Sequence, residues 1–250
     1  GTQNLLDASR EFGVDRFQNL GWLGDDWLFR TELIYSDVKN AVLWKDLRLV
    51  QTGTAPDGRP IYGYRATDPS SGTGSRPTSV NDLLLTNSTK GSSFVVTADV
   101  QKSWDTVAGN FDWYLGYTFT DAEETNPGTS STALSNWDNV AVADPNNPNL
   151  ATSNYETRHR FVMTLNWKKA FFGDYNTTAG LFLERRSGQP FSYTFGNGTS
   201  VFGDPRQGSR QRQLLYVPKD VNDYEVAGGL TKDAFEAFIN ANGLGKYRGQ

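Results

Sequence analysis

The stretch FDWYLGYTFTDAEE, from Phe111 to Glu124, alternates apolar residues with polar or small ones and then ends in acidic residues. Alternation with a period of two is the signature of a β-strand whose two faces meet different surroundings. The first face needs an apolar environment and the second a hydrated one. The first face carries Phe111, Trp113, Leu115, Tyr117 and Phe119, and the second carries Asp112, Tyr114, Gly116, Thr118 and Thr120.

The same alternation recurs along the chain. Between Ser93 and Trp104, for example, Phe94, Val96 and Val100 fall on one side of an extended chain and polar residues on the other. Runs of this length and pattern indicate half-buried strands. We therefore predict six strands, at residues 10–18, 26–47, 91–104, 109–121, 157–169 and 175–187.

The connections between these strands alternate between short and long. The long ones cover residues 48–90, 122–156 and 188–250, and the last contains one predicted helix that Thr231 can cap and Gly243 can end. In an up-and-down meander this alternation places the short turns at one end and the long loops at the other, as in outer-membrane β-barrels.

The predicted fold class is therefore all-β, an antiparallel up-and-down transmembrane β-barrel with long extracellular loops and one short loop helix. We treat residues 1–250 as one partial barrel of about six strands. Because such barrels need about eight strands or more, we expect the chain to be a fragment of a longer protein.

Composition excludes several classes of protein and of functional site. Hydrophobic residues make up 37% of the chain, and the mean hydropathy is −0.56, so no stretch suits a transmembrane helix. A barrel strand hides only half of its residues from water, which keeps its mean hydropathy low. The net charge of −4 and the scattered Lys and Arg residues argue against nucleic acid as a partner. Cysteine is absent, which excludes thiolate metal sites and cysteine nucleophiles.

In the barrel interpretation, outer-membrane lipid is the first partner. The apolar set from Phe111 to Phe119 faces lipid, and the alternate set faces a hydrated lumen. Aromatic residues flank the short turns, where amphipathic rings favour the interface between lipid and water. The predicted interfacial belt consists of Trp104, Trp167, Phe171 and Tyr175.

Several motifs resemble those of TonB-dependent outer-membrane transporters, and in particular the Oar-like branch of that family. The resemblance covers about Arg10 to Gln250. It implies an energised transporter with a barrel of about 22 strands, a bacterial outer-membrane location, and a plug that engages TonB and is not present in residues 1–250. The motifs are STKGSSFVVTADVQKSW (Ser88–Trp104), NFDWYLGYTFTDAEE (Asn110–Glu124), RSGQPFSYTFGNG (Arg186–Gly198), LLYVP (Leu214–Pro218) and YRGQ (Tyr247–Gln250).

We predict no enzymatic activity, cofactor or metal. The one histidine, His159, is interpreted as an interfacial structural residue, and the acids of Asp121–Glu124 and Asp144–Asn149 as solvated loop residues rather than calcium ligands. A set of arginines can contact an anionic substrate or lipid phosphate, or can simply pair with carboxylates or water. These are Arg185, Arg186, Arg206, Arg210 and Arg212, with Arg206, Arg210 and Arg212 the predicted loop contacts.

Two rival functions fit the same pattern. A passive porin-like channel or a surface adhesin would use a similar barrel without an energised plug. A soluble, secreted carbohydrate-binding β protein would instead bury its aromatic faces against a second sheet. The substrate and the direction of transport are not encoded in any motif of the sequence.

Overall fold

The computed structural model describes residues 8–21, 24–65, 73–74, 82–195, 212–226 and 229–249. The chain, treated as one domain from its sequence, divides into two compact units. One contains Gly1–Leu43, Asn87–Pro127 and Leu150–Phe191 and is called the sheet unit below. The other contains Trp44–Thr86, Gly128–Asn149 and Ser192–Gln250 and is called the loop unit.

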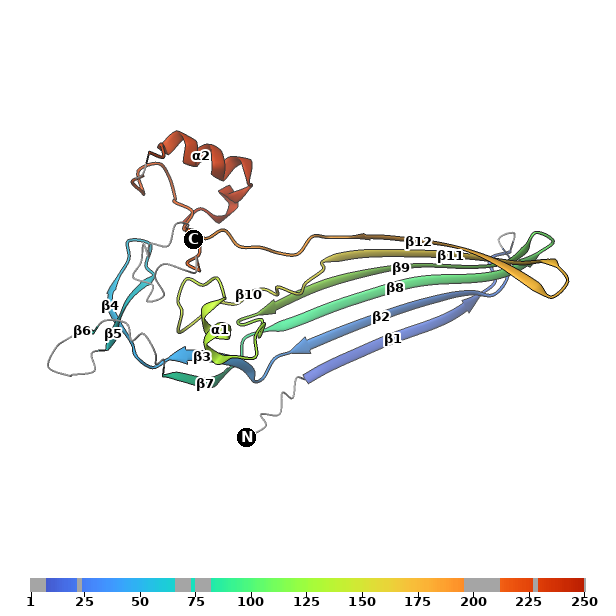
Figure 1. The fold of residues 1–250 in the computed structure, drawn as a ribbon, viewed down its shortest axis with the longest axis horizontal. Helices are drawn as coiled ribbons and strands as arrows, with labels where there is room; N and C mark the ends of the chain where they lie inside the picture. The colour runs from blue at the N-terminus through green and yellow to red at the C-terminus, as the bar shows by residue number, and fades with distance from the viewer. Residues whose placement is uncertain are drawn as a thin grey trace. The chain divides into compact units, whose positions relative to one another are not determined.

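The sheet unit is an antiparallel meander (Figure 1). Its long strands pair in the order β1-β2-β8-β9-β11-β12, and the two-residue strand β10 (Ala151–Thr152) pairs with the end of β9. Within the described residues, β1 and β12 are the edges of an open sheet. The long strands are β1 (Ala8–Gln18), β2 (Trp27–Asp37), β8 (Ser92–Thr106), β9 (Gly109–Glu124), β11 (His159–Phe172) and β12 (Tyr175–Arg186).

The all-β, antiparallel character of the prediction is confirmed, and so is the segregation of loop lengths. The hairpins β1–β2, β8–β9 and β11–β12 all turn at one end of the sheet, called the turn end (Figure 1). The connections from β2 to β8 and from β9 to β11 leave the opposite end, called the loop end. The chain segments that link the sheet unit to the loop unit all start from that loop end.

Two predictions about the strands are wrong. Residues 26–47 do not form one strand, because the polar segment between Asp37 and Ala41 turns the chain into β3 (Ala41–Asp46), which pairs with β7 (Leu83–Ser88). Residues 48–90 are not simply a loop. They contain a separate sheet of β4 (Leu49–Thr54), β5 (Pro60–Arg65) and β6 (Thr73–Gly74).

The hairpin between β4 and β5 has a sequence signal that the period-two search missed. The residues APDG, Ala55 to Gly58, combine Pro, Asp and Gly in the order that favours a tight turn. Gly58 has a φ of +85° and donates its N–H to the Ala55 carbonyl at 2.9 Å. The Arg59 guanidinium pairs with the Asp57 carboxylate at 2.5 Å and donates to the Leu214 carbonyl, which ties this turn to the C-terminal part of the loop unit.

The loop unit has two small apolar clusters. In one, Leu49 and Trp137 are buried against Trp44 and Tyr62, and Trp137 belongs to the short helix α1 (Ala133–Asp138). In the other, Val217 is buried with Ile239 of α2 (Lys232–Ala241) and Leu244 of the 3₁₀ turn η3 (Leu244–Tyr247). The predicted C-terminal helix is thus confirmed as α2. As expected, the Thr231 side chain caps it by accepting the Ala234 N–H at 3.1 Å.

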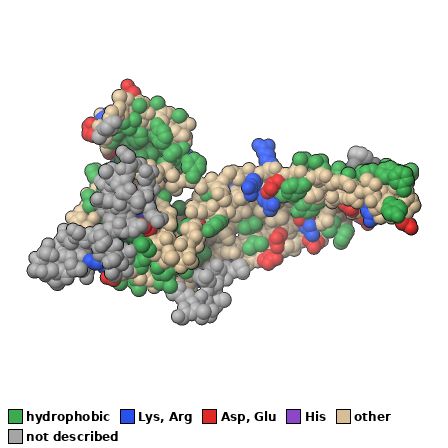
Figure 2. Space-filling view, in the orientation of Figure 1, with side chains coloured by type: hydrophobic (Ala, Val, Ile, Leu, Met, Phe, Trp, Pro, Cys, Tyr) green, Lys and Arg blue, Asp and Glu red, His purple; other side chains and the backbone are tan. Residues whose placement is uncertain are grey.

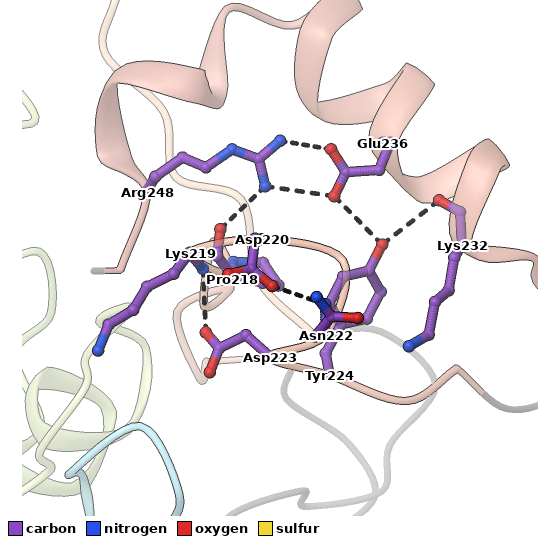
Figure 3. Close-up of polar contacts among 9 residues, drawn as sticks. All are labelled: Pro218, Lys219, Asp220, Asn222, Asp223, Tyr224, Lys232, Glu236 and Arg248. Carbon is purple, nitrogen blue, oxygen red and sulfur yellow. Dashed lines mark hydrogen bonds and ion pairs between the residues drawn. The ribbon is translucent and has the colours of Figure 1, made fainter.

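A polar clasp holds η3 against α2 (Figure 3). The Arg248 guanidinium binds both carboxylate oxygens of Glu236 and also donates to the Pro218 carbonyl at 2.9 Å. The Tyr224 hydroxyl donates to the same carboxylate at 3.2 Å. The contact with Arg248 is the main reason that the pKa of Glu236 lies below its usual value.

We predict that the clasp weakens in acid. Because the pKa of Glu236 is lower in the folded chain, the clasp contributes stability above the unfolded-state pKa and loses it as the pH falls through the folded-state pKa. The substitution Arg248→Gln should raise the Glu236 pKa toward its ordinary value, as measured by carboxyl NMR titration. An unchanged titration curve would contradict the clasp.

We also predict that Gly109, at the β8–β9 turn, cannot be replaced. Its φ is +126°, and a Cβ there would lie 2.6 Å from the Lys168 carbonyl oxygen and from Trp167 Nε1. Gly109→Ala should lower the free energy of unfolding in urea by roughly 1–3 kcal/mol. The matched control is Gly173→Ala in the β11–β12 turn, where φ is +59° and no atom lies within 4 Å of the new Cβ. Equal losses in both variants would show that the close approach at Gly109 does not matter.

Candidate functional site

The candidate site is one whole face of the long sheet, called the apolar face. The register places Leu115 of β9 opposite Val100 of β8 and Met163 of β11. It places Met163 in turn opposite Leu183 of β12, and Phe29 of β2 opposite Val100. Since side chains of directly paired residues share a face, five strands contribute apolar side chains to the same row.

An aromatic row lies at the turn end of this face, and we call it the turn-end band. Trp104 stacks on Phe111 at a centroid distance of 5.4 Å, and Trp27 meets Trp113 edge-on at 5.9 Å. The predicted belt residues Trp104, Trp167 and Phe171 thus lie in one band, and Tyr175 is the exposed first residue of β12. The band consists of Trp27, Trp104, Phe111, Trp113, Trp167 and Phe171.

Hydrogen bonds fix the polar atoms of this band. Trp167 donates its indole N–H to the Ala108 carbonyl at 2.8 Å, and Lys169 donates to the Val107 carbonyl at 3.0 Å. Lys102 donates to the Asp25 carbonyl and lies 5.9 Å from the Trp27 ring. The two lysines stand on the apolar face, but their ammonium groups reach back to the turns. Long basic side chains behave in this way where an apolar surface meets water.

The structure reveals a second aromatic row that the sequence did not predict. At the loop end of the apolar face, the Phe161 ring lies 4.6 Å from the Tyr117 ring, and the Tyr117 hydroxyl bonds His159 Nδ1 at 2.9 Å. The centroid of the His159 ring also lies 5.4 Å from that of the Phe119 ring. This loop-end band consists of Tyr35, Phe94, Tyr117, Phe119, His159 and Phe161.

An aliphatic strip separates the two bands. The strip carries no charge on the inner strands β2, β8, β9 and β11, whereas on the edge strands Arg16 of β1 stands in the row of Leu115 and Arg185 of β12 in the row of Ala98. The charged residues of the apolar face in the described strands stand near the ends of their own strands. Those at the turn end are Arg16, Lys102 and Lys169, and those at the loop end are Arg10, Asp37, Asp121, Glu123 and Arg185. The strip itself consists of Leu33, Val96, Ala98, Val100, Leu115, Met163, Leu165, Leu181 and Leu183.

The apolar face is not covered by other described residues of its unit. Leu115 is 38% exposed, Phe161 46% and Leu183 51%, although none of them lies at the end of its strand. Exposed apolar patches larger than a few hundred Å² mark sites of contact with another protein or a membrane. In the view of Figure 2 the sheet carries charged side chains along its middle and hydrophobic ones at the turn end, so the aliphatic strip is not the surface turned to the reader.

The opposite face, called the polar face, carries paired charges and hydroxyl groups together with some apolar side chains. The apolar ones include Leu28, Ile34, Val95, Val162 and Phe182. Arg30 of β2 pairs with Asp99 of β8 at 2.9 Å, and Arg160 of β11 pairs with Glu184 of β12 at 2.8 Å. Between them, the Ser103 hydroxyl donates to Asp112 at 2.7 Å. The two faces of the sheet therefore differ in chemistry along its whole width.

The structure describes only one of the three arginines that were predicted as loop contacts. Arg206 and Arg210 lie outside the described residues. Arg212 is only 3% exposed; its guanidinium lies 4.1 Å from the Trp137 ring and donates to the Trp137 carbonyl. It is therefore part of the packing of the loop unit and not an exposed ligand contact. Its neighbours on the chain gave no sign of this burial, which arises from a distant helix.

The acidic loop residues serve local structure. Asp121 pairs with Arg158 at 2.8 Å, and Glu124 accepts the Asn154 N–H at 2.9 Å. Asp144 accepts the Tyr62 hydroxyl and the Asn146 N–H. Among the described residues, no group of three or more acids or histidines is placed to hold a metal ion.

Comparison with protein-family models, with curated proteins and with solved structures found no match. In the part of the chain that the structure describes, no helix is both long enough and apolar enough to cross a membrane.

We predict that Arg212 matters for folding and not for exposed binding. Arg212→Gln removes a buried cation–aromatic contact and a charged hydrogen bond, and should destabilise the loop unit by about 2–4 kcal/mol in urea unfolding. The control Arg185→Gln, at an exposed position on β12, should change stability by less than about 0.5 kcal/mol. Equal stability of the two variants would contradict the structural role of Arg212.

Proposed function

We propose that the sheet unit is part of the wall of an outer-membrane β-barrel, with the apolar face against lipid and the polar face toward a hydrated lumen. The observation that carries this proposal is the pair of aromatic bands with an aliphatic strip between them that is uncharged on the inner strands β2, β8, β9 and β11. Transmembrane barrels have this outer surface, an apolar band about 25 Å tall between two aromatic girdles.

The spacing of the bands on β8 supports the proposal, whereas on β9 the bands lie closer, with Trp113 and Tyr117 four residues apart. Trp104 and Phe94 belong to opposite bands of β8 and are ten residues apart. At about 3.3 Å per residue they are separated by roughly 33 Å along the strand, and a strand tilt of about 40° reduces this to about 25 Å across a membrane. The strands of 11 to 16 residues are long enough to span that distance.

The loop unit fits the same proposal. In such barrels the short turns face the periplasm and the longer loops face the exterior. All connections to the loop unit leave the loop end of the sheet, so we assign the loop unit to the extracellular side. There it would make the first contact with a substrate.

Within this proposal the protein is a TonB-dependent receptor or transporter of the bacterial outer membrane. Support comes from the resemblance of three ordered loop motifs, Arg186–Gly198, Leu214–Pro218 and Tyr247–Gln250, to those of that family. The gene sequence on both sides of residues 1–250 tests this class. An upstream plug domain behind a signal peptide supports it, and a complete barrel gene without a plug favours the passive channel or adhesin.

We predict that lipid quenches the tryptophan of the apolar face. With Trp113 as the single remaining tryptophan, reconstitution into vesicles of brominated phosphatidylcholine should reduce its fluorescence at least twofold relative to unbrominated vesicles, because bromine quenches on contact. If the protein stays soluble without detergent and its fluorescence is not quenched, the rival interpretation as a soluble carbohydrate-binding protein is supported.

We also predict that Leu115→Arg impairs membrane assembly. A cation in the middle of the lipid-facing strip costs about 2–4 kcal/mol. The matched control is Gln101→Arg, which places the same side chain on the polar face of β8, opposite Tyr114. Assembly is measured as the fraction of protein that reaches the outer membrane and resists extraction. Equal assembly of both variants would contradict lipid contact at Leu115.

A further inference from the structure

We propose that Arg185 and His159 together bind the phosphate of an anionic lipid headgroup at the loop end of the apolar face. The inference rests on the proposed function, because it requires lipid against this face. It adds one specific contact with a lipid headgroup to the general apolar contact proposed for the two bands and the strip.

The register brings the two side chains together. His159 of β11 and Ser187, which directly follows β12, are joined by the Ser187 N–H to the His159 carbonyl at 2.8 Å. Arg185 is opposite Phe161, two residues further along β11. His159 and Arg185 are therefore diagonal neighbours on the same face, where long side chains can reach one ligand.

Both side chains have groups left for a ligand. His159 uses Nδ1 for the Tyr117 hydroxyl, which leaves Nε2. Arg185 is exposed and makes no ion pair or side-chain hydrogen bond with any residue that the structure describes. Nearby Arg158 pairs with Glu156 and Asp121, and Arg160 pairs with Glu184. Arg186, on the polar face, resembles Arg185 in having no such partner among the described residues, but it faces away from His159.

The surroundings favour a lipid phosphate over a free anion. Arg185 stands beside Phe161 and Leu183, which are 46% and 51% exposed. A free phosphate would leave this apolar surface in water, whereas the acyl chains of a lipid would cover it. Guanidinium groups bind phosphate through two parallel N–H donors, and the aromatic band sets the depth at which headgroups would lie.

The experiment measures lipid retention on the folded protein in dodecyl maltoside micelles. Phosphatidylglycerol is titrated and bound lipid is counted by native mass spectrometry, with phosphatidylcholine as the comparison. Arg185→Gln should weaken phosphatidylglycerol binding about tenfold, and His159→Gln should weaken it by a smaller factor. The matched control is Arg186→Gln, which removes the same charge from the adjacent residue on the polar face and should leave the affinity unchanged.

The outcomes separate this inference from the proposed function. Equal affinities in Arg185→Gln, Arg186→Gln and the unsubstituted protein would overturn the headgroup contact, even with Trp113 still quenched by brominated lipid. Competition by millimolar inorganic phosphate that displaces phosphatidylglycerol would show a free-anion site instead and also overturn it. Loss of Trp113 quenching would refute the membrane wall itself.

Discussion

The antiparallel register of the long sheet is the constraint on which the rest of the structure depends. Because side chains alternate with a period of two, a slip of one residue in any strand would move all its apolar side chains to the other face. The observed register aligns Val100, Leu115, Met163 and Leu183 in one row. It also gathers the aromatic residues of separate strands into bands, although no single strand contains a band. The proposed lipid contact, the proposed lumen and the proposed headgroup site all depend on that alignment.

The long connections of the chain fold together into the loop unit. Its apolar clusters are small, and polar contacts supply much of its order. Asn146 uses its side-chain amide to bond both the N–H and the carbonyl of Asp46, 100 residues away, at 2.8 Å each. Burial raises the pKa of the Asp46 carboxyl above its ordinary value. Arg212 covers Trp137, and Arg248 closes the C-terminal clasp. A preformed unit of this kind loses less conformational entropy on binding than flexible loops would.

The chemistry of the two sheet faces gives the proposed membrane wall its physical logic. Charged side chains on the polar face pair across strands, as Arg30, which is 41% exposed, does with the largely covered Asp99. On the apolar face, Lys102 and Lys169 send their ammonium groups to turn carbonyls. Arg185, like Arg10 and Arg16 on the same face, has no such partner among the described residues. Its place diagonal to His159 is what directs the headgroup proposal to it.

The sequence by itself determined the six long strands of the sheet unit apart from the end of the second, their apolar and polar faces, the end at which the turns gather and the helix behind Thr231. These depend on local periodicity and turn chemistry, which the residues of each segment carry. Only the tertiary structure decided that the predicted loops fold together, that Arg212 is buried, and that Tyr35, Phe94 and Phe161 join a second aromatic band. Each of these depends on the pairing of segments far apart in the chain. Period-two alternation cannot predict that pairing, because it specifies the face on which a residue lies but not its neighbour on the next strand. The split of residues 26–47 has the same cause, since β3 forms where β7 offers it a partner.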